Sequence, residues 1–274
     1  MSDMPKLDGA FVVDPTKFDN ITIVGSGAYS RTTIDRSVGC QNLVQRVITM
    51  RQGGEIALHN DDAEEVLFVV SGRGDATIEN RGHALLVDTG MLIPPGQTCD
   101  VVNSGRDELV LVSIVSPQPG QAPVFQADAF LRSDHKITVH EAEEKSIPAG
   151  GDRHFKLMID PRYGCRNLTQ FMGIIEKSQA PFHTHTYEEV IYVLSGEGIV
   201  HIGNESRDIK AGACVYLSPG TSHCLENPGT EPLRLLGVFC PAGDPGSHED
   251  QTGLIWIHFL VNSVSASTNI SMSS

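Results

Sequence analysis

The chain has 274 residues, of which 40% are hydrophobic and 20% are charged. This composition is typical of soluble globular proteins, and the length fits two domains. A formal net charge of -14 would repel polyanions and acidic bilayers, so we exclude nucleic acid and membranes as partners. The N-terminal segment has no basic stretch followed by an apolar run, so we expect no targeting peptide and a cytoplasmic location.

Short segments rich in β-branched residues recur along the first half of the chain, separated by glycine, proline or asparagine. In chain order they are residues 47–50, 65–70, 75–80, 90–95 and 108–115. With 27 glycines and 15 prolines in the chain, this spacing predicts an all-β fold arranged as a sandwich or barrel. Helical periodicity appears only weakly, for instance at residues 127–134.

The second half repeats the first. GCQNLVQRV (39–47) recurs as GCRNLTQFM (164–172), and EEVLFVVSGRG (64–74) recurs as EEVIYVLSGEG (188–198), at offsets of 125 and 124 residues. Each copy is long enough for a complete domain, so we expect domains at 1–136 and 137–250 and a tail at 251–274. The apolar stretch 253–261 is too short to cross a bilayer, and we expect it to cover a barrel or a subunit interface.

Six cysteines are scattered through the chain without a CxxC pair. In the absence of a secretory signal we interpret them as reduced thiols and expect no disulfide framework. Two of them, Cys214 and Cys224, have no evident flanking base and are interpreted as small core residues.

A candidate metal site lies in the second copy. His183 and His185 alternate along an extended segment and can face one ion, and Glu189 follows after the bend. His223 comes after the turn at 218–220, which antiparallel packing could bring back against the first histidines. Three imidazoles and a carboxylate suit Fe, Mn, Ni, Cu or Zn, without fixing which. The alternative is a pair of solvated histidines, but the first copy keeps the same turn residues without these imidazoles, which favours a ligand role.

These residues carry a resemblance to a known family. His183, His185, Glu189 and Gly196 are spaced as in the first cupin motif, and Gly212, Pro219, Gly220, His223 and Asn227 are similar to the second. The chain therefore resembles a bicupin, which implies two double-stranded β-helix (jelly-roll) barrels and one divalent transition metal in the second. One departure is that proline directly precedes glycine at 219–220, whereas the motif usually has a residue between them.

The first copy departs further from this pattern. The corresponding residues are His59, Asp61, Glu65 and Cys99, so a carboxylate and a thiol replace two imidazoles. Because a hard and a soft ligand together suit no common catalytic ion, we expect a degenerate site in a barrel that serves as scaffold. A pocket for a small ligand there is the alternative.

Other residues near the motif are candidates for the pocket wall. They are Phe171, Phe182, Tyr187 and His201, and for each a role in core packing is the favoured alternative. Arg153 and His154 precede the second barrel and could enter its mouth. By strand alternation Glu188 and Glu226 should face away from the ligands, and we interpret them as surface charges.

Two classes of function follow. The first is a metal-dependent enzyme, for which we favour a mononuclear-metal, dioxygenase-like oxidoreductase acting on a small organic substrate; resemblance to metal-binding cupins also implies decarboxylases and isomerases. The second is a protein that binds a metal or a small ligand without catalysis. We expect a homo-oligomer, specifically a homodimer, because jelly-roll sheets leave edges that another subunit can cover.

Overall fold

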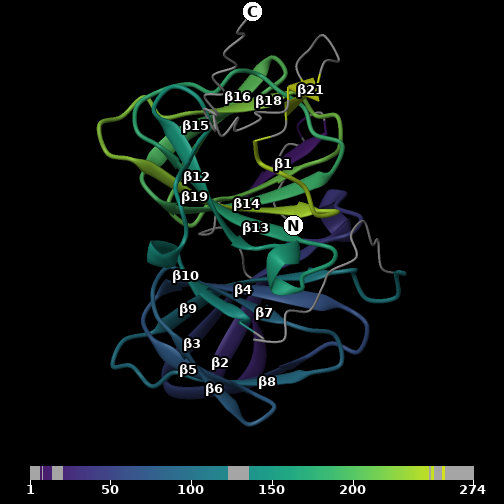
Figure 1. The fold of residues 1–274 in the computed structure, drawn as a ribbon, viewed down its shortest axis with the longest axis vertical. Helices are drawn as coiled ribbons and strands as arrows, with labels where there is room; N and C mark the ends of the chain where they lie inside the picture. Colours follow the sequence, from purple (N-terminus) through teal and green to yellow (C-terminus); the bar gives the residue numbers. More distant parts are fainter. Residues whose placement is uncertain are drawn as a thin grey trace, which may run out of the picture.

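The computed structural model describes residues 7, 9–13, 21–122, 136–246, 248–249 and 255–256. Figure 1 shows two β-barrels stacked along the long axis of the molecule, one for each repeat. The described residues form strands and short 3₁₀ helices and contain no α-helix, which confirms the predicted all-β fold. No helix in this part of the chain is long and apolar enough to cross a membrane.

The first repeat contains β2 (Thr22–Ile34), β3 (Val44–His59), β4 (Glu64–Ser71), β5 (Gly74–Ile78), β6 (Arg81–Leu85), β7 (Thr89–Ile93), β8 (Thr98–Val102) and β9 (Leu109–Ser116). The second contains β11 (Ile147–Pro148), β12 (Arg153–Ile159), β13 (Thr169–Ile175), β14 (Glu188–Ser195), β15 (Glu197–Ile202), β16 (Glu205–Lys210), β17 (Cys214–Leu217), β18 (His223–Glu226) and β19 (Leu233–Cys240). The 3₁₀ helices are η2 (Arg36–Val38), η3 (Glu141–Glu143) and η4 (Pro161–Tyr163).

A hairpin of β20 (His248–Glu249) and β21 (Ile255–Trp256) follows the second barrel. Apart from these backbone strands, the apolar tail predicted at 253–261 lies outside the described residues, as does the weakly helical segment 127–134. The homodimer, whose interface the tail was expected to cover, therefore stays a prediction.

The two barrels differ where the predicted metal segment begins. In the first barrel β3 runs unbroken from residue 44 to 59, pairing first with β9 and then with β8. In the second barrel β13 ends at Ile175, and the chain continues towards β18 through single bridges at Gln179 and His183. Pro181 lies between these bridges and has no amide hydrogen to donate, which accounts for the interrupted ladder.

Each barrel completes a sheet with a strand from the far side of the expected domain boundary. β1 (Ala10–Val13) pairs with β17 in the sheet of the second barrel. β10 (Thr138–His140) pairs with β7 in the sheet of the first. Sheet membership thus does not follow the chain division expected at residues 136 and 137.

Hydrophobic side chains form a core inside each barrel and a third core between the two. The core between the barrels includes Phe68 and Ile114 from the first repeat and Met172 and Val238 from the second. All six cysteines are buried, and for Cys214 and Cys224 this agrees with their interpretation as small core residues. The shared core makes the two barrels one packed unit.

The structure corrects the interpretation of Glu188 as a surface charge. It faces away from the metal ligands, as strand alternation predicts, but it is buried between the barrels and is not a surface charge. Its carboxylate accepts hydrogen bonds from the amides of Gln41 and Asn42 in the first barrel and from the hydroxyl of Tyr216. Glu226 is half-buried and contacts Nε2 of His201 at 2.7 Å. The outer face of β14 is the partner surface of the other barrel, which the strand pattern alone does not reveal.

Candidate metal centre

Reciprocal backbone hydrogen bonds bring His183 and His223 side by side. The amide of each residue donates to the carbonyl oxygen of the other, both at 3.0 Å. The turn before His223 contains Gly220, whose φ of +78° favours glycine and whose amide donates to the carbonyl oxygen of His185. The turn at 218–220 therefore does return onto the histidine segment.

Three imidazoles converge at one point. Nitrogen atoms of His183, His185 and His223 lie within 4.8 Å of one another. His183 Nδ1 lies 2.9 Å from the carbonyl oxygen of Pro181, and His223 Nδ1 lies 2.9 Å from that of Thr221. A carbonyl oxygen can only accept, so each Nδ1 carries the proton and each Nε2 presents its lone pair, the arrangement that metal-binding histidines adopt.

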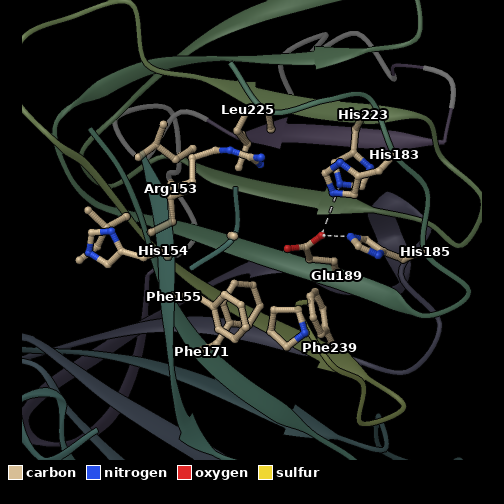
Figure 2. A pocket seen from close by; sticks show the side chains of 17 residues that line it. Arg153, His154, Phe155, Phe171, His183, His185, Glu189, His223, Leu225 and Phe239 are labelled. Atoms are coloured by element: carbon tan, nitrogen blue, oxygen red, sulfur yellow. Dashed lines mark ion pairs between the residues drawn. The ribbon is translucent and has the colours of Figure 1, made fainter. Parts of the chain in front are cut away.

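Glu189 provides a carboxylate at the same point. Its Oε2 atom lies 3.5 Å from His185 Nε2 and 3.6 Å from His223 Nε2, as the dashed lines in Figure 2 show. The side chain is buried, and among the described residues no donor forms a hydrogen bond with Oε2. Burial raises the pKa of Glu189 to about 8, and it lowers the pKa of His183.

A divalent metal ion fits this set of residues. A buried carboxylate requires a compensating charge or hydrogen bonds, and Oε2 of Glu189 faces Nε2 of His223, a nitrogen that presents its lone pair. Three imidazole nitrogens and one carboxylate oxygen are also ligands that divalent transition metals prefer. The arrangement thus brings together the four residues predicted as ligands.

The four residues lie at one end of a cavity of about 100 Å³ in the second barrel. Figure 2 shows Phe155, Phe171 and Phe239 gathered along one side of it. The guanidinium of Arg153 lies beside Leu225, on the same side as His183 and His223. The cavity is small compared with the roughly 300–1,000 Å³ of pockets for drug-sized ligands, so it fits a small molecule.

Of the four predicted pocket residues, Phe171 lines the cavity. The Tyr187 ring stacks on His185, with centroids 4.7 Å apart and planes at 15°. Phe182 and His201 are not among the described lining residues and contact each other, with centroids 6.2 Å apart.

Sequence reasoning missed Phe155 and Phe239, whereas Arg153 and His154, which it named as candidates for the mouth of the barrel, both line the cavity. Phe155 lies opposite Gly173 on β13, and Phe239 lies opposite Glu189 on β14. The register of strands distant in sequence places these residues, and a local pattern does not fix that register. A comparison of the two repeats could have found them. Phe155 and Phe239 are aromatic only in the copy with the metal motif, because the corresponding residues of the first copy are Ser30 and Val115.

The first barrel does not bring its corresponding residues together. His59 Nε2 contacts Asp61 at 3.0 Å, and the Asp61 side chain is 91% exposed. Cys99 belongs to the apolar core, and burial raises its pKa to about 12. Buried Glu65 is bound by Arg46 Nη2 at 2.8 Å and by the hydroxyl of Ser113. A guanidinium thus supplies the positive charge that Glu189 lacks among the described residues of the second barrel.

Two segments of the chain, residues 46–115 and 171–239, match the family described as "Cupin domain", one in each barrel. The chain belongs to the cupin family. With a match in each repeat it is a tandem bicupin, as its resemblance to the two motifs implied. This cupin is 39% identical over 62 residues to the oxalate-binding protein of Thermotoga maritima, a match of 22% of this chain and 51% of that protein. The chain thus spans about half the length of that curated relative.

Solved structures share the whole arrangement of this bicupin. A glyoxylate-induced protein of Pseudomonas aeruginosa superposes with a TM-score of 0.72 at 17% identity, over 89% of this chain and 94% of that one. An oxalate decarboxylase of Bacillus subtilis superposes with a TM-score of 0.68 at 14% identity, over 85% and 77%. At these identities the superpositions confirm the jelly-roll fold alone.

Proposed function

We propose that the second barrel binds one divalent transition metal ion through His183, His185, Glu189 and His223, and that it binds a small organic acid at this ion. The observation that carries the proposal is the buried Glu189 carboxylate, whose Oε2 atom lies within 3.6 Å of the Nε2 atoms of His185 and His223 and meets no hydrogen-bond donor among the described residues. A cation at this point would compensate the buried charge.

The charge of the centre supports an acidic ligand. A divalent ion with three neutral imidazoles and one carboxylate keeps one positive charge, and the guanidinium of Arg153 adds a second at the same end of the cavity. The described residues that line the rest of the cavity are mostly apolar. The similarity to an oxalate-binding protein and to an oxalate decarboxylase described as having Mn(II) centres supports the same class of ligand and a metal.

For the reaction we propose a dioxygenase-like oxidation, with decarboxylation or isomerisation as the alternative. When bound, the metal would supply Lewis acidity and a site for dioxygen. Decarboxylation leaves a carbanion that must receive a proton, so an acid is needed beside the substrate. Among the described residues that line the cavity, Glu189 is the only carboxylic acid, and it is assigned to the metal. Oxidation makes no such demand on the lining residues, and Arg153 would orient the acid in either reaction.

Elemental analysis of protein purified from metal-supplemented medium tests the proposal. We expect one ion per chain in the wild type and less than a tenth of that in His185→Ala and His223→Ala. The matched first-barrel variants Asp61→Ala and Cys99→Ala should keep a full equivalent, since these residues do not converge. A wild type without metal, or equal losses in both sets of variants, overturns the proposal. Oxygen uptake with small acids then distinguishes the oxidation from decarboxylation, which would release carbon dioxide without consuming oxygen.

A further inference from the structure

The cavity is divided into a charged end and an apolar end. The charged end contains the metal ligands and Arg153, whose Nε donates to the carbonyl oxygen of Gly150 at 3.1 Å. The apolar wall contains Phe155, Phe171 and Phe239, joined edge to face or at a tilt with centroids 6.4 and 4.8 Å apart. Leu235 and Ile175 also line the cavity.

The aromatic wall depends on a glycine. Gly237 lies opposite Phe171 on the neighbouring strand, and a Cβ atom at Gly237 would overlap the phenylalanine ring. The ring therefore lies flat over the strand and narrows the cavity. In the first barrel the corresponding residues are Arg46 and Ser113, which instead bind Glu65.

The other two residues of the aromatic wall also differ between the two barrels. Phe155 and Phe239 correspond to Ser30 and Val115 in the first barrel. The repeat with all three imidazoles has the aromatic rings, and the repeat that keeps only His59 has no aromatic ring at the three corresponding positions. Since both barrels keep the same fold, the fold does not require the rings, and a ligand beside the metal explains them.

Together, the charged end and the apolar end of the cavity restrict the chemical class of the ligand. Resting on the proposed function, we propose that the ligand is a short monocarboxylic acid with an oxygen atom on C2, a 2-hydroxy or 2-oxo acid, and an apolar end of a few carbons. Such acids chelate divalent ions through the carboxylate and the C2 oxygen. The carboxylate lies at the end with Arg153, and the apolar end lies against Phe171 and Phe239.

A dicarboxylate fits the cavity less well. In oxalate or malonate the second carboxylate takes the place of the C2 oxygen at the metal, so no alkyl end remains to cover the aromatic rings of the cavity. An alkyl end instead gains about fourfold in affinity for each buried methylene. The volume of the cavity, about 100 Å³, limits this gain in affinity to an alkyl end of a few carbons.

Isothermal titration of metal-loaded protein, with one Mn²⁺ per chain verified by elemental analysis, tests the inference. The probes are glycolate, lactate and 2-hydroxybutyrate as a series of increasing length, butyrate as the acid without a C2 oxygen, and oxalate and malonate as dicarboxylates. We expect affinity to rise about fourfold per carbon along the series. Butyrate and both dicarboxylates should bind at least tenfold more weakly than 2-hydroxybutyrate.

Three variants test which residues cause the dependence on chain length and which bind the carboxylate. Phe171→Ser should abolish the dependence on chain length and leave glycolate binding within about threefold of the wild type, whereas the matched control Phe182→Ser, outside the described lining, should keep the dependence. Arg153→Met should weaken the whole series tenfold or more at full metal content.

Oxalate binding more tightly than 2-hydroxybutyrate, or equal affinity along the wild-type series, overturns the inference and leaves the proposed function standing. A wild type that holds no metal overturns both.

Discussion

Glu64 and Glu188 make the same contact in opposite directions. Glu64 of the first barrel accepts hydrogen bonds from the amides of Arg166 and Asn167 in the second, at 2.6 and 2.7 Å. Glu188 of the second accepts from Gln41 and Asn42 in the first, at 2.6 and 2.8 Å. The duplication relates the two glutamates to each other and the two loops to each other. The barrels are therefore joined by a pair of equivalent contacts about an approximate two-fold axis.

Glu188→Ala should weaken the interface between the barrels. The substitution leaves two amides and the hydroxyl of Tyr216 without their acceptor, at roughly 1–3 kcal/mol for each unsatisfied buried group. Because both amide contacts are only partly buried, we expect the free energy of unfolding to fall by about 2–4 kcal/mol. Urea denaturation measures this loss. Glu226→Ala is the control, because that glutamate is half-buried and contacts only His201 among the hydrogen-bond partners given above. Equal losses in the two variants would contradict the role of Glu188.

Arg46→Ala should destabilise the first barrel without changing metal content. It leaves the buried Glu65 carboxylate without its guanidinium, and breaking a buried ion pair costs about 3–5 kcal/mol; the partial exposure of Arg46 places the expected loss near the lower end. The surface pair of Arg207 and Glu205 provides the control, since Arg207→Ala should cost about 1 kcal/mol or less. An Arg46→Ala protein as stable as the wild type would mean that Glu65 does not depend on this pair.

Tyr187 should position His185 for metal binding. Its ring is stacked on the imidazole, packs on Phe239 with centroids 4.3 Å apart, and lies so close to Gly243 that an added Cβ would clash. The corresponding residue of the first barrel is Ala63, where the imidazole is also missing. We expect Tyr187→Ala to lower metal affinity about tenfold or more, and Tyr187→Phe to keep it, because the ring makes the contact. Competition with a chelator measures the affinity, and unchanged affinity in Tyr187→Ala would rule the role out.

Chelator-treated protein should lose stability as the pH rises. The pKa of Glu189 is raised by burial from 4.5 to about 8 in the folded chain. A raised folded-state pKa gives a contribution to stability that is complete below pH 4.5 and is lost as the pH rises through about 8. Glu189→Gln cannot ionise, so its stability should fall less between pH 5 and 9, by a difference on the order of a few kcal/mol. Urea titrations at pH 5, 7 and 9 test this, with Glu226→Gln as the control. Identical slopes for the wild type and Glu189→Gln would contradict a buried, uncompensated carboxylate.

The fold and the four converging residues were predictable because their signals are local or duplicated. Alternation put His183 and His185 on one face, and Pro219 and Gly220 marked the turn that returns His223. The repeat then separated the barrel with the imidazoles from the one without. These signals need no knowledge of which strands meet across the molecule.

What the sequence did not predict depends on contacts between distant strands. Alternation placed Glu188 opposite the ligands correctly, but the covering of that face by the first barrel is a tertiary contact. The pairing of Arg46 with Glu65 likewise requires β3 and β4 to lie on either side of β9, which no local pattern encodes. The aromatic wall of the cavity has the same origin.

The exchanged strands impose an order on the growing chain. β10 can join β7 soon after the first barrel leaves the ribosome, since its partner has just been made. β1 pairs with β17, which is synthesised about 200 residues later, so β1 must wait for its partner strand. When it docks, the carbonyl oxygen of Gly9 accepts hydrogen bonds from Ser218 and Thr221, in the turn that precedes His223. β1 thus completes the support of the candidate metal centre only after β17 has been made.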